Sequence, residues 1–162
     1  MPNDYYGLPL HPLVVHATVV VVPLAALTVV LAAVWPRFRR WAGPLPAVIS
    51  LIGVLLVPLS TSTGETLEKH VERSALLEKH TEMAEGLLPW MIGLLVFAVI
   101  GYVLHHRHSR GQTASRPLII TVTALAVVAA LGTTVQVGRI GHSGAKAAWD
   151  DTNMSSTSQS GE

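Results

Sequence analysis

The sequence predicts an all-α integral membrane protein, a bundle of four membrane-spanning helices, on two observations. Four stretches of at least 20 residues contain no Asp, Glu, Lys or Arg, and a helix needs about 20 apolar residues to cross the bilayer core. All ten acidic residues lie before the first stretch, between the second and third, or after the fourth, whereas the charges in the other two gaps are all arginine. This alternation is typical of a chain that keeps its arginines in the cytoplasm, so we expect both termini to be extracytoplasmic.

Composition supports the same class. Half of the residues are hydrophobic and only 13% are charged, against about 25% in a typical soluble domain. In lipid only helices or closed barrels pair every backbone group, and the apolar stretches lack the alternation of barrel strands. A soluble bundle would need a polar face on each helix. The absence of cysteine excludes disulfides, thiolate metal sites and covalently attached haem, and no basic footprint for nucleic acid is present.

The elements follow in order. Residues 1–12 form an extracytoplasmic N-terminal segment with tyrosines suited to the headgroup region, and residues 13–149 form the bundle. The spans are predicted at about 13–34, 44–63, 86–104 and 117–138. Prolines and tryptophans around residues 35–44 mark the inner interface, and small alanine and glycine residues in the fourth span permit close helix packing.

Two segments outside the spans are also interpretable. Residues 65–85 predict a partly helical outer connection, with apolar residues on one side and charged residues on the others. This segment either lies on the membrane surface as an amphipathic helix or extends the third span outward from near Ser74. Residues 150–162 are rich in Ser, Thr and Gly and predict a disordered tail.

The eight histidines fall into two groups. Three of them, His105, His106 and His108, lie in the second arginine loop, where a solvated polar turn is the simplest interpretation. The other five belong to the extracytoplasmic face: His11, His16, His70, His80 and His142. Folding four spans into one bundle brings the outer ends of the helices to one membrane level, so imidazoles from three helices are expected to converge there.

Within the outer group His16 is the most informative residue, because it lies inside an uncharged stretch. An ionisable group there usually faces the bundle interior and marks a functional site. His11 and His16 differ in direction by about 140° on a helix, so at most one of them joins a central site, and we favour His16. His80 and His142 would contribute from the third and fourth helices. The alternative is a set of interfacial histidines bonded to backbone or water.

Neutral imidazole is the commonest metal ligand in proteins, which leaves three functional hypotheses. One is a single b-type haem held by His16 and His80 for electron transfer, with Arg139 pairing a propionate at the interface. The second is a mononuclear zinc, copper or iron site on His16, His80, His142 and Glu65. The third is a cofactor-free accessory subunit that packs against a membrane complex. No nucleophile motif indicates an enzyme, so a redox carrier or accessory subunit is favoured.

The stretch from Gly7 to His16, GLPLHPLVVH, resembles the signature of the bacterial four-span membrane family Domain of Unknown Function 2231. Residues 73–80 and 140–145 are similar to later blocks of that family. The resemblance implies a multi-pass protein of the bacterial inner membrane. The architecture is similar to small four-helix cytochromes that hold haem between histidines of different spans, which implies His16 and His80 as axial ligands and His142 as the alternative. A redox or membrane-complex partner and a homo-oligomer are further expectations.

Overall fold

The computed structural model describes residues 4–5, 8–68 and 75–158, and it describes side chains over 11–66 and 77–146. Two short antiparallel strands precede the helices, β1 (Asp4–Tyr5) and β2 (Leu8–Pro9). The helices are α1 (Leu10–Val34), α2 (Pro36–Ala42), α3 (Leu45–Glu68), α4 (Ala75–Glu85), α5 (Leu87–Ser109) and α6 (Arg116–Ser158). The predicted all-helical bundle is therefore confirmed.

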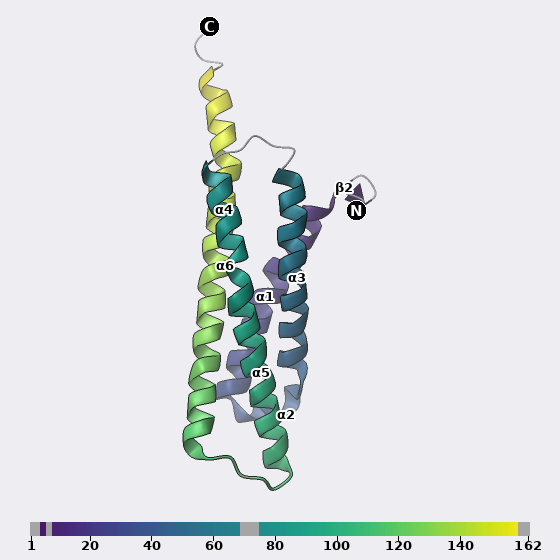
Figure 1. Cartoon of the computed structure of the whole chain (residues 1–162), viewed down its shortest axis with the longest axis vertical. Helices are drawn as coiled ribbons and strands as arrows, with labels where there is room; N and C mark the ends of the chain where they lie inside the picture. Colours follow the sequence, from purple (N-terminus) through teal and green to yellow (C-terminus); the bar gives the residue numbers. More distant parts are fainter. Residues whose placement is uncertain (1–3, 6–7, 69–74, 159–162) are drawn as a thin grey trace.

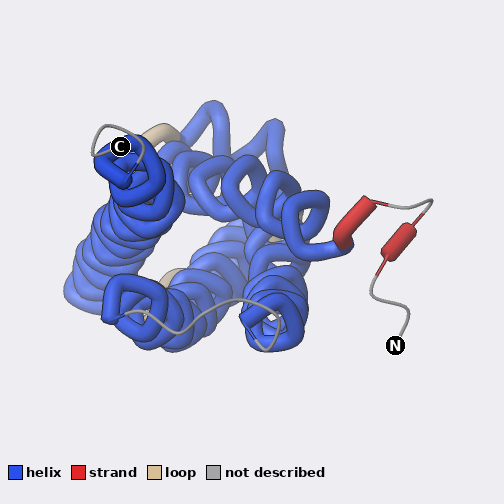
Figure 2. Tube along the Cα trace, turned by 90° about the horizontal axis from the view of Figure 1, so that it is seen from above, coloured by secondary structure: helices blue, strands red, loops and turns tan. Residues whose placement is uncertain are grey.

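Four long helices form an up-and-down bundle, with α4 stacked in line on α5 (Figure 1). Viewed along the axis, each of α1, α3, α5 and α6 packs against two neighbours, in the ring order α1, α3, α5, α6 (Figure 2). Within the described residues four segments have the length and composition to cross a membrane: His11–Val34, Leu45–Thr66, Leu77–Ser109 and Arg116–Lys146. The four predicted spans all lie within these segments or overlap them.

The bundle core is built from small residues on two helices and larger ones on a third. Ala25 and Ala26 of α1 and Ala129 and Ala130 of α6 are buried, which lets these helix backbones approach closely. Large side chains of α5 fill the remaining space, chief among them Met91 and Leu94, both fully buried. These side chains fill the middle of the bundle.

The outside of the bundle is also apolar. Large hydrophobic side chains are exposed on every long helix; Val20 is 65% exposed, Leu55 63% and Ile120 67%. Soluble monomers rarely expose a continuous apolar surface of this kind, whereas lipid solvates it. Inside the bundle, the buried hydroxyls of the described residues pair with carbonyls of their own helix. Ser50 donates to the Pro46 carbonyl at 2.7 Å, and Thr133 donates to the Ala129 carbonyl at 2.8 Å.

The outer connection takes the second of its two expected forms. Helix α4 extends α5 outward and packs along α6 (Figure 1); it does not lie flat as a separate surface helix. A turn at Gly86 separates the two helices. Pro89 lies one turn beyond Glu85 and has no N–H to bond the Glu85 carbonyl, which explains why the helix is interrupted there. Residues 69–74, including His70, lie outside the described residues.

The tail differs from the prediction. Helix α6 continues to Ser158, through a segment whose composition predicted disorder from residue 150. No proline follows Pro117 in the sequence, so nothing in the chain forces the helix to stop earlier. Residues 159–162 lie outside the described part of the chain.

The two ends of the bundle carry different charges. We call the end formed by α2 and the α5–α6 connection the arginine end, because it holds Arg37, Arg39, Arg40, Arg107, Arg110 and Arg116. We call the opposite end the acidic end; it contains the start of α1, the end of α3, all of α4, and α6 from Val137 onward.

Candidate functional site

A cavity of about 490 Å³ opens among the helices at the acidic end. It is lined by residues of α1, α3, α4, α5 and α6, and most of them are apolar or small. The polar side chains in its wall include His11 from α1 and His80 from α4. The cavity therefore brings two imidazoles from helices far apart in the sequence to one apolar space.

The position of His11 is fixed by the residue pair Thr63-Gly64 of α3. The Nδ1 atom of His11 lies 3.2 Å from the Thr63 hydroxyl oxygen. That hydroxyl donates to carbonyls of its own helix, Leu59 or Ser60, both at 3.0 Å. With that hydrogen donated to a carbonyl, the oxygen is able to accept from the imidazole, and this network assigns the ring proton to Nδ1 and a lone pair to Nε2.

Glycine leaves room for this ring. A Cβ placed on Gly64 would lie 3.0 Å from Cε1 of His11, a contact tighter than ordinary packing allows. The imidazole thus lies directly against the α3 backbone, in space that any larger residue would fill.

The position of His80 follows the same arrangement on the other half of the bundle. Its Nδ1 lies 2.9 Å from the Ser143 hydroxyl, which donates to the Ile140 carbonyl at 2.9 Å. A Cβ on Gly144 would lie 3.0 Å from Cε1 of His80. His80 is therefore also protonated on Nδ1, with a lone pair on Nε2.

We call Thr63-Gly64 and Ser143-Gly144 the two hydroxyl–glycine pairs. The first pair lies on α3 and holds His11 of α1. The second pair lies on α6 and holds His80 of α4, the helix that extends α5 outward. His11 and His80 lie close enough to interact electrostatically. The two halves of the bundle therefore bring imidazoles in equivalent settings to one cavity.

The structure brings only some of the predicted site residues to the cavity. His80 and Glu65 line the cavity, as expected, but His16 does not. His16 is exposed on the outside of α1, and its Nδ1 donates to the Pro12 carbonyl one turn earlier, at 2.6 Å. The roughly 140° between His11 and His16 does separate them, but His11 takes the inward position. His16 was favoured because it lies deeper in the apolar stretch, and depth does not determine direction.

Two further candidates also lie outside the cavity wall. His142 and Arg139 are exposed on α6, and the residues of that helix that line the cavity include Gly141 and Gly144 instead. Over residues 11–66 and 77–146, no group of three or more His, Cys, Asp or Glu side chains is placed to hold a metal ion. The set His16, His80, His142 and Glu65 is thus not assembled.

The residues that sequence reasoning missed are His11 and the two hydroxyl–glycine pairs. A signal for them is present: a hydroxyl residue followed by glycine occurs near the outer end of the second span and again after the fourth, at Thr63-Gly64 and Ser143-Gly144. Glycine positions on a helix admit a bulky ring from a neighbouring helix, so these two pairs mark places where an imidazole fits against α3 and α6.

Four membrane-length apolar helices in one bundle, with a histidine-lined cavity at one end, define an integral membrane helical-bundle protein. The family model described as "Predicted membrane protein (DUF2231)" matches residues 7–156. The chain therefore belongs to this family, as its opening residues indicated. Comparison with curated proteins gave no match, and comparison with solved structures gave none.

Proposed function

We propose that the cavity at the acidic end binds one b-type haem between His11 and His80, and that the protein transfers electrons. The observation that carries the proposal is the pair of imidazoles in equivalent settings, each with its Nδ1 beside a hydroxyl and both in the wall of the same cavity. Metal-ligating histidines usually donate their other ring N–H to a fixed acceptor, which sets the tautomer and the ring orientation. The two hydroxyls supply that acceptor here.

The size and lining of the cavity support a large, mostly apolar ligand. Its volume of about 490 Å³ falls within the roughly 300–1,000 Å³ of typical cofactor and ligand sites. The walls combine apolar side chains with small residues such as Gly64 and Gly144, which leave space beside the imidazoles. Cofactor sites in helical bundles are built in this way, from side chains on facing helices.

A b-type haem held by two imidazoles supplies reversible one-electron chemistry. The chain's own contribution is to keep both Nε2 atoms unprotonated, to hold the two rings against α3 and α6, and to surround the site with apolar walls. Glu65, Thr61 and Ser60 also line the cavity and provide its polar edge on α3. A single metal ion is less well supported, because such sites generally use three or four protein ligands.

The test is an absorbance spectrum of the protein purified in detergent after expression with ample haem. We expect a Soret band with the sharp visible bands of low-spin, six-coordinate iron. His11→Ala and His80→Ala should each abolish the low-spin spectrum, because each removes one axial ligand.

His16→Ala and His142→Ala are the matched controls, since both residues are exposed histidines close to the same end of the bundle. Both variants should retain the wild-type spectrum. A colourless wild-type protein would refute the proposal in favour of a cofactor-free accessory subunit. Loss of the spectrum in His16→Ala with retention in His11→Ala would overturn the ligand assignment.

A further inference from the structure

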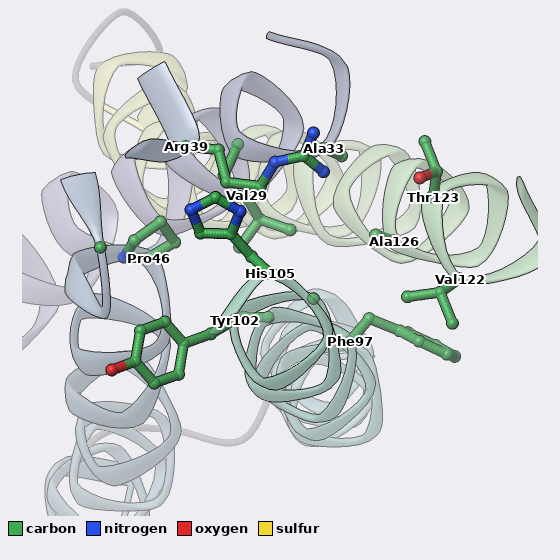
Figure 3. A pocket seen from close by; sticks show the side chains of 14 residues that line it. Val29, Ala33, Arg39, Pro46, Phe97, Tyr102, His105, Val122, Thr123 and Ala126 are labelled. Carbon is green, nitrogen blue, oxygen red and sulfur yellow. The ribbon is translucent and has the colours of Figure 1, made fainter. Parts of the chain in front are cut away.

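A second, smaller cavity lies at the arginine end, away from the proposed haem site. Its volume is about 50 Å³, and it is lined by residues of α1, α2, α3, α5 and α6. The two basic side chains in its wall are Arg39 from α2 and His105 from α5, which interact electrostatically and lie close together in Figure 3. Most of the remaining lining is apolar.

Arg39 has an unsatisfied donor at this place. Its Nε atom is buried and has no hydrogen-bond partner among the described residues. Buried polar atoms are nearly always hydrogen-bonded in folded proteins, and a guanidinium group is charged under all ordinary conditions. A complementary acceptor is therefore missing from the chain around Arg39.

The sequence has no acidic residue to fill that role. No Asp or Glu occurs in residues 5–64 or 86–149, which include α1, α2, α5 and the connection from α5 to α6. The charged neighbours of the cavity are basic, since Arg40, His106 and His108 also interact electrostatically with His105. No carboxylate of the chain is therefore at hand, and an anion from outside the protein would supply both an acceptor and the opposite charge.

The dimensions of the cavity restrict the anion. A space of about 50 Å³ admits one or two waters or the oxygens of a small oxyanion, because a water occupies about 30 Å³ in the liquid. It is far too small for a cofactor. The planar guanidinium fork of arginine matches the oxygens of a phosphate group, which it binds through two parallel hydrogen bonds.

Aromatic residues place Arg39 at the depth of lipid headgroups. Trp35 and Phe38 stack with ring centroids 6.3 Å apart, and Phe38 contacts Trp41 at 5.7 Å. Trp41 is 77% exposed. Tryptophans of this kind concentrate at the membrane–water interface, and basic pockets between helix ends there suit anionic headgroups.

We propose that Arg39 and His105 bind a phosphate oxyanion supplied by the headgroup of an anionic phospholipid. Arg39 donates Nε–H and one terminal N–H to the phosphate oxygens, and His105 adds a further donor from α5. The bound headgroup thereby links α2 to α5. This site is independent of the haem proposal, because it lies at the opposite end of the bundle and shares no residue with the first cavity.

The test measures phosphatidylglycerol bound to the delipidated protein by native mass spectrometry, with phosphatidylcholine as the neutral comparison. We expect Arg39→Gln to reduce the affinity for phosphatidylglycerol about tenfold or more, because it removes a charge-assisted pair of hydrogen bonds. Arg37→Gln is the matched control: it makes the same charge change on the same helix, at an exposed residue outside the cavity. It should keep the wild-type affinity apart from a small general effect.

Two further measurements keep the proposal falsifiable. If Arg39→Gln fails to fold, His105→Gln provides a second variant, which we expect to weaken binding while His106→Gln does not. Equal loss of phosphatidylglycerol in Arg39→Gln and Arg37→Gln would overturn the site, since it would show only a general surface charge. Saturation by inorganic phosphate alone, with no preference for phosphatidylglycerol over phosphatidylcholine, would overturn the lipid assignment.

Discussion

At the scale of single residues, the hydroxyl partners of the two histidines make a specific prediction. Ser143→Ala removes the acceptor that holds His80 Nδ1–H at 2.9 Å. Loss of such an outer partner typically lowers metal affinity about 10- to 100-fold, so we expect haem affinity to fall within that range while the fold is kept. Haem titration of the apoprotein measures the change.

Ser62→Ala is the control, because the Ser62 hydroxyl donates to the Leu59 carbonyl of its own helix and, among the described side chains, bonds neither histidine. Equal affinities in the two variants would contradict the role of Ser143.

Two glycine substitutions distinguish the space needed by the His80 ring from the effect of glycine on helix stability. A Cβ on Gly144 would press on His80, whereas one on Gly141 of the same helix would meet nothing within 4 Å, although both glycines line the cavity. Alanine for glycine stabilises a helix by up to about 1 kcal/mol. We therefore expect Gly141→Ala to raise or keep the thermal midpoint and to leave the absorbance spectrum unchanged. Gly144→Ala should displace His80 and weaken or abolish the low-spin spectrum; a wild-type spectrum in Gly144→Ala would show that His80 does not need this space.

The difference between His11 and His16 shows what the sequence can supply at this scale. Helical periodicity correctly separated the two residues, and the apolar context correctly marked the outer end of the bundle as the place to look. Periodicity alone does not say which direction is inward, because the first apolar stretch has no polar face to orient it. The inward direction depends on the partner helix α3, where Gly64 leaves room for the ring and Thr63 binds it. Thr63 lies 52 residues from His11 in the sequence, so no local pattern contains this contact.

At the scale of the elements, close packing between α5 and α6 depends on one glycine. A Cβ on Gly132 would overlap the indole ring of Trp90, so this large side chain would have to leave its place against α6. Overpacking of this kind costs about 1–3 kcal/mol, so Gly132→Ala should lower the thermal unfolding midpoint in detergent, followed by far-ultraviolet circular dichroism. Gly138→Ala, on the same helix with open space at the Cβ position, should not lower it. A midpoint for Gly132→Ala at or above that of Gly138→Ala would contradict the contact.

Elements were predictable where a single physical rule governed them. The lengths of the apolar stretches identified all four spans, because the bilayer imposes a minimum length on each crossing. The outer connection was not decided, since an amphipathic pattern fits both a surface helix and a helix packed on α6. Gln136 of α6 helps to fix the second arrangement by donating to the Met83 carbonyl of α4 at 2.7 Å, a contact between residues 53 apart that no local pattern contains.

At the scale of the whole molecule, the two ends of the bundle have separate chemistry. The acidic end holds two imidazoles in the wall of a large cavity, and the arginine end holds a small cavity beside a guanidinium Nε that has no partner among the described residues. A path of buried apolar side chains, from Leu87 through Met91 to Ala98 on α5, lies between them. If both proposals hold, an electron carrier at one surface is anchored to anionic lipid at the other.

The direction of this arrangement across the membrane follows from charge. The arginine end carries six arginines and no acid, and arginines near span ends are retained in the cytoplasm, so we expect the histidine-lined cavity to face away from the cytoplasm. The chain has no cysteine, so single cysteines report unambiguously. We expect Lys146→Cys, at an exposed position of α6 near the acidic end, to react with a membrane-impermeant maleimide in intact spheroplasts. Thr113→Cys, in the α5–α6 connection, should react only after the membrane is permeabilised. The reverse labelling pattern would place the cavity on the cytoplasmic side and its redox partners with it, because an electron acceptor must reach the surface that the cavity opens to.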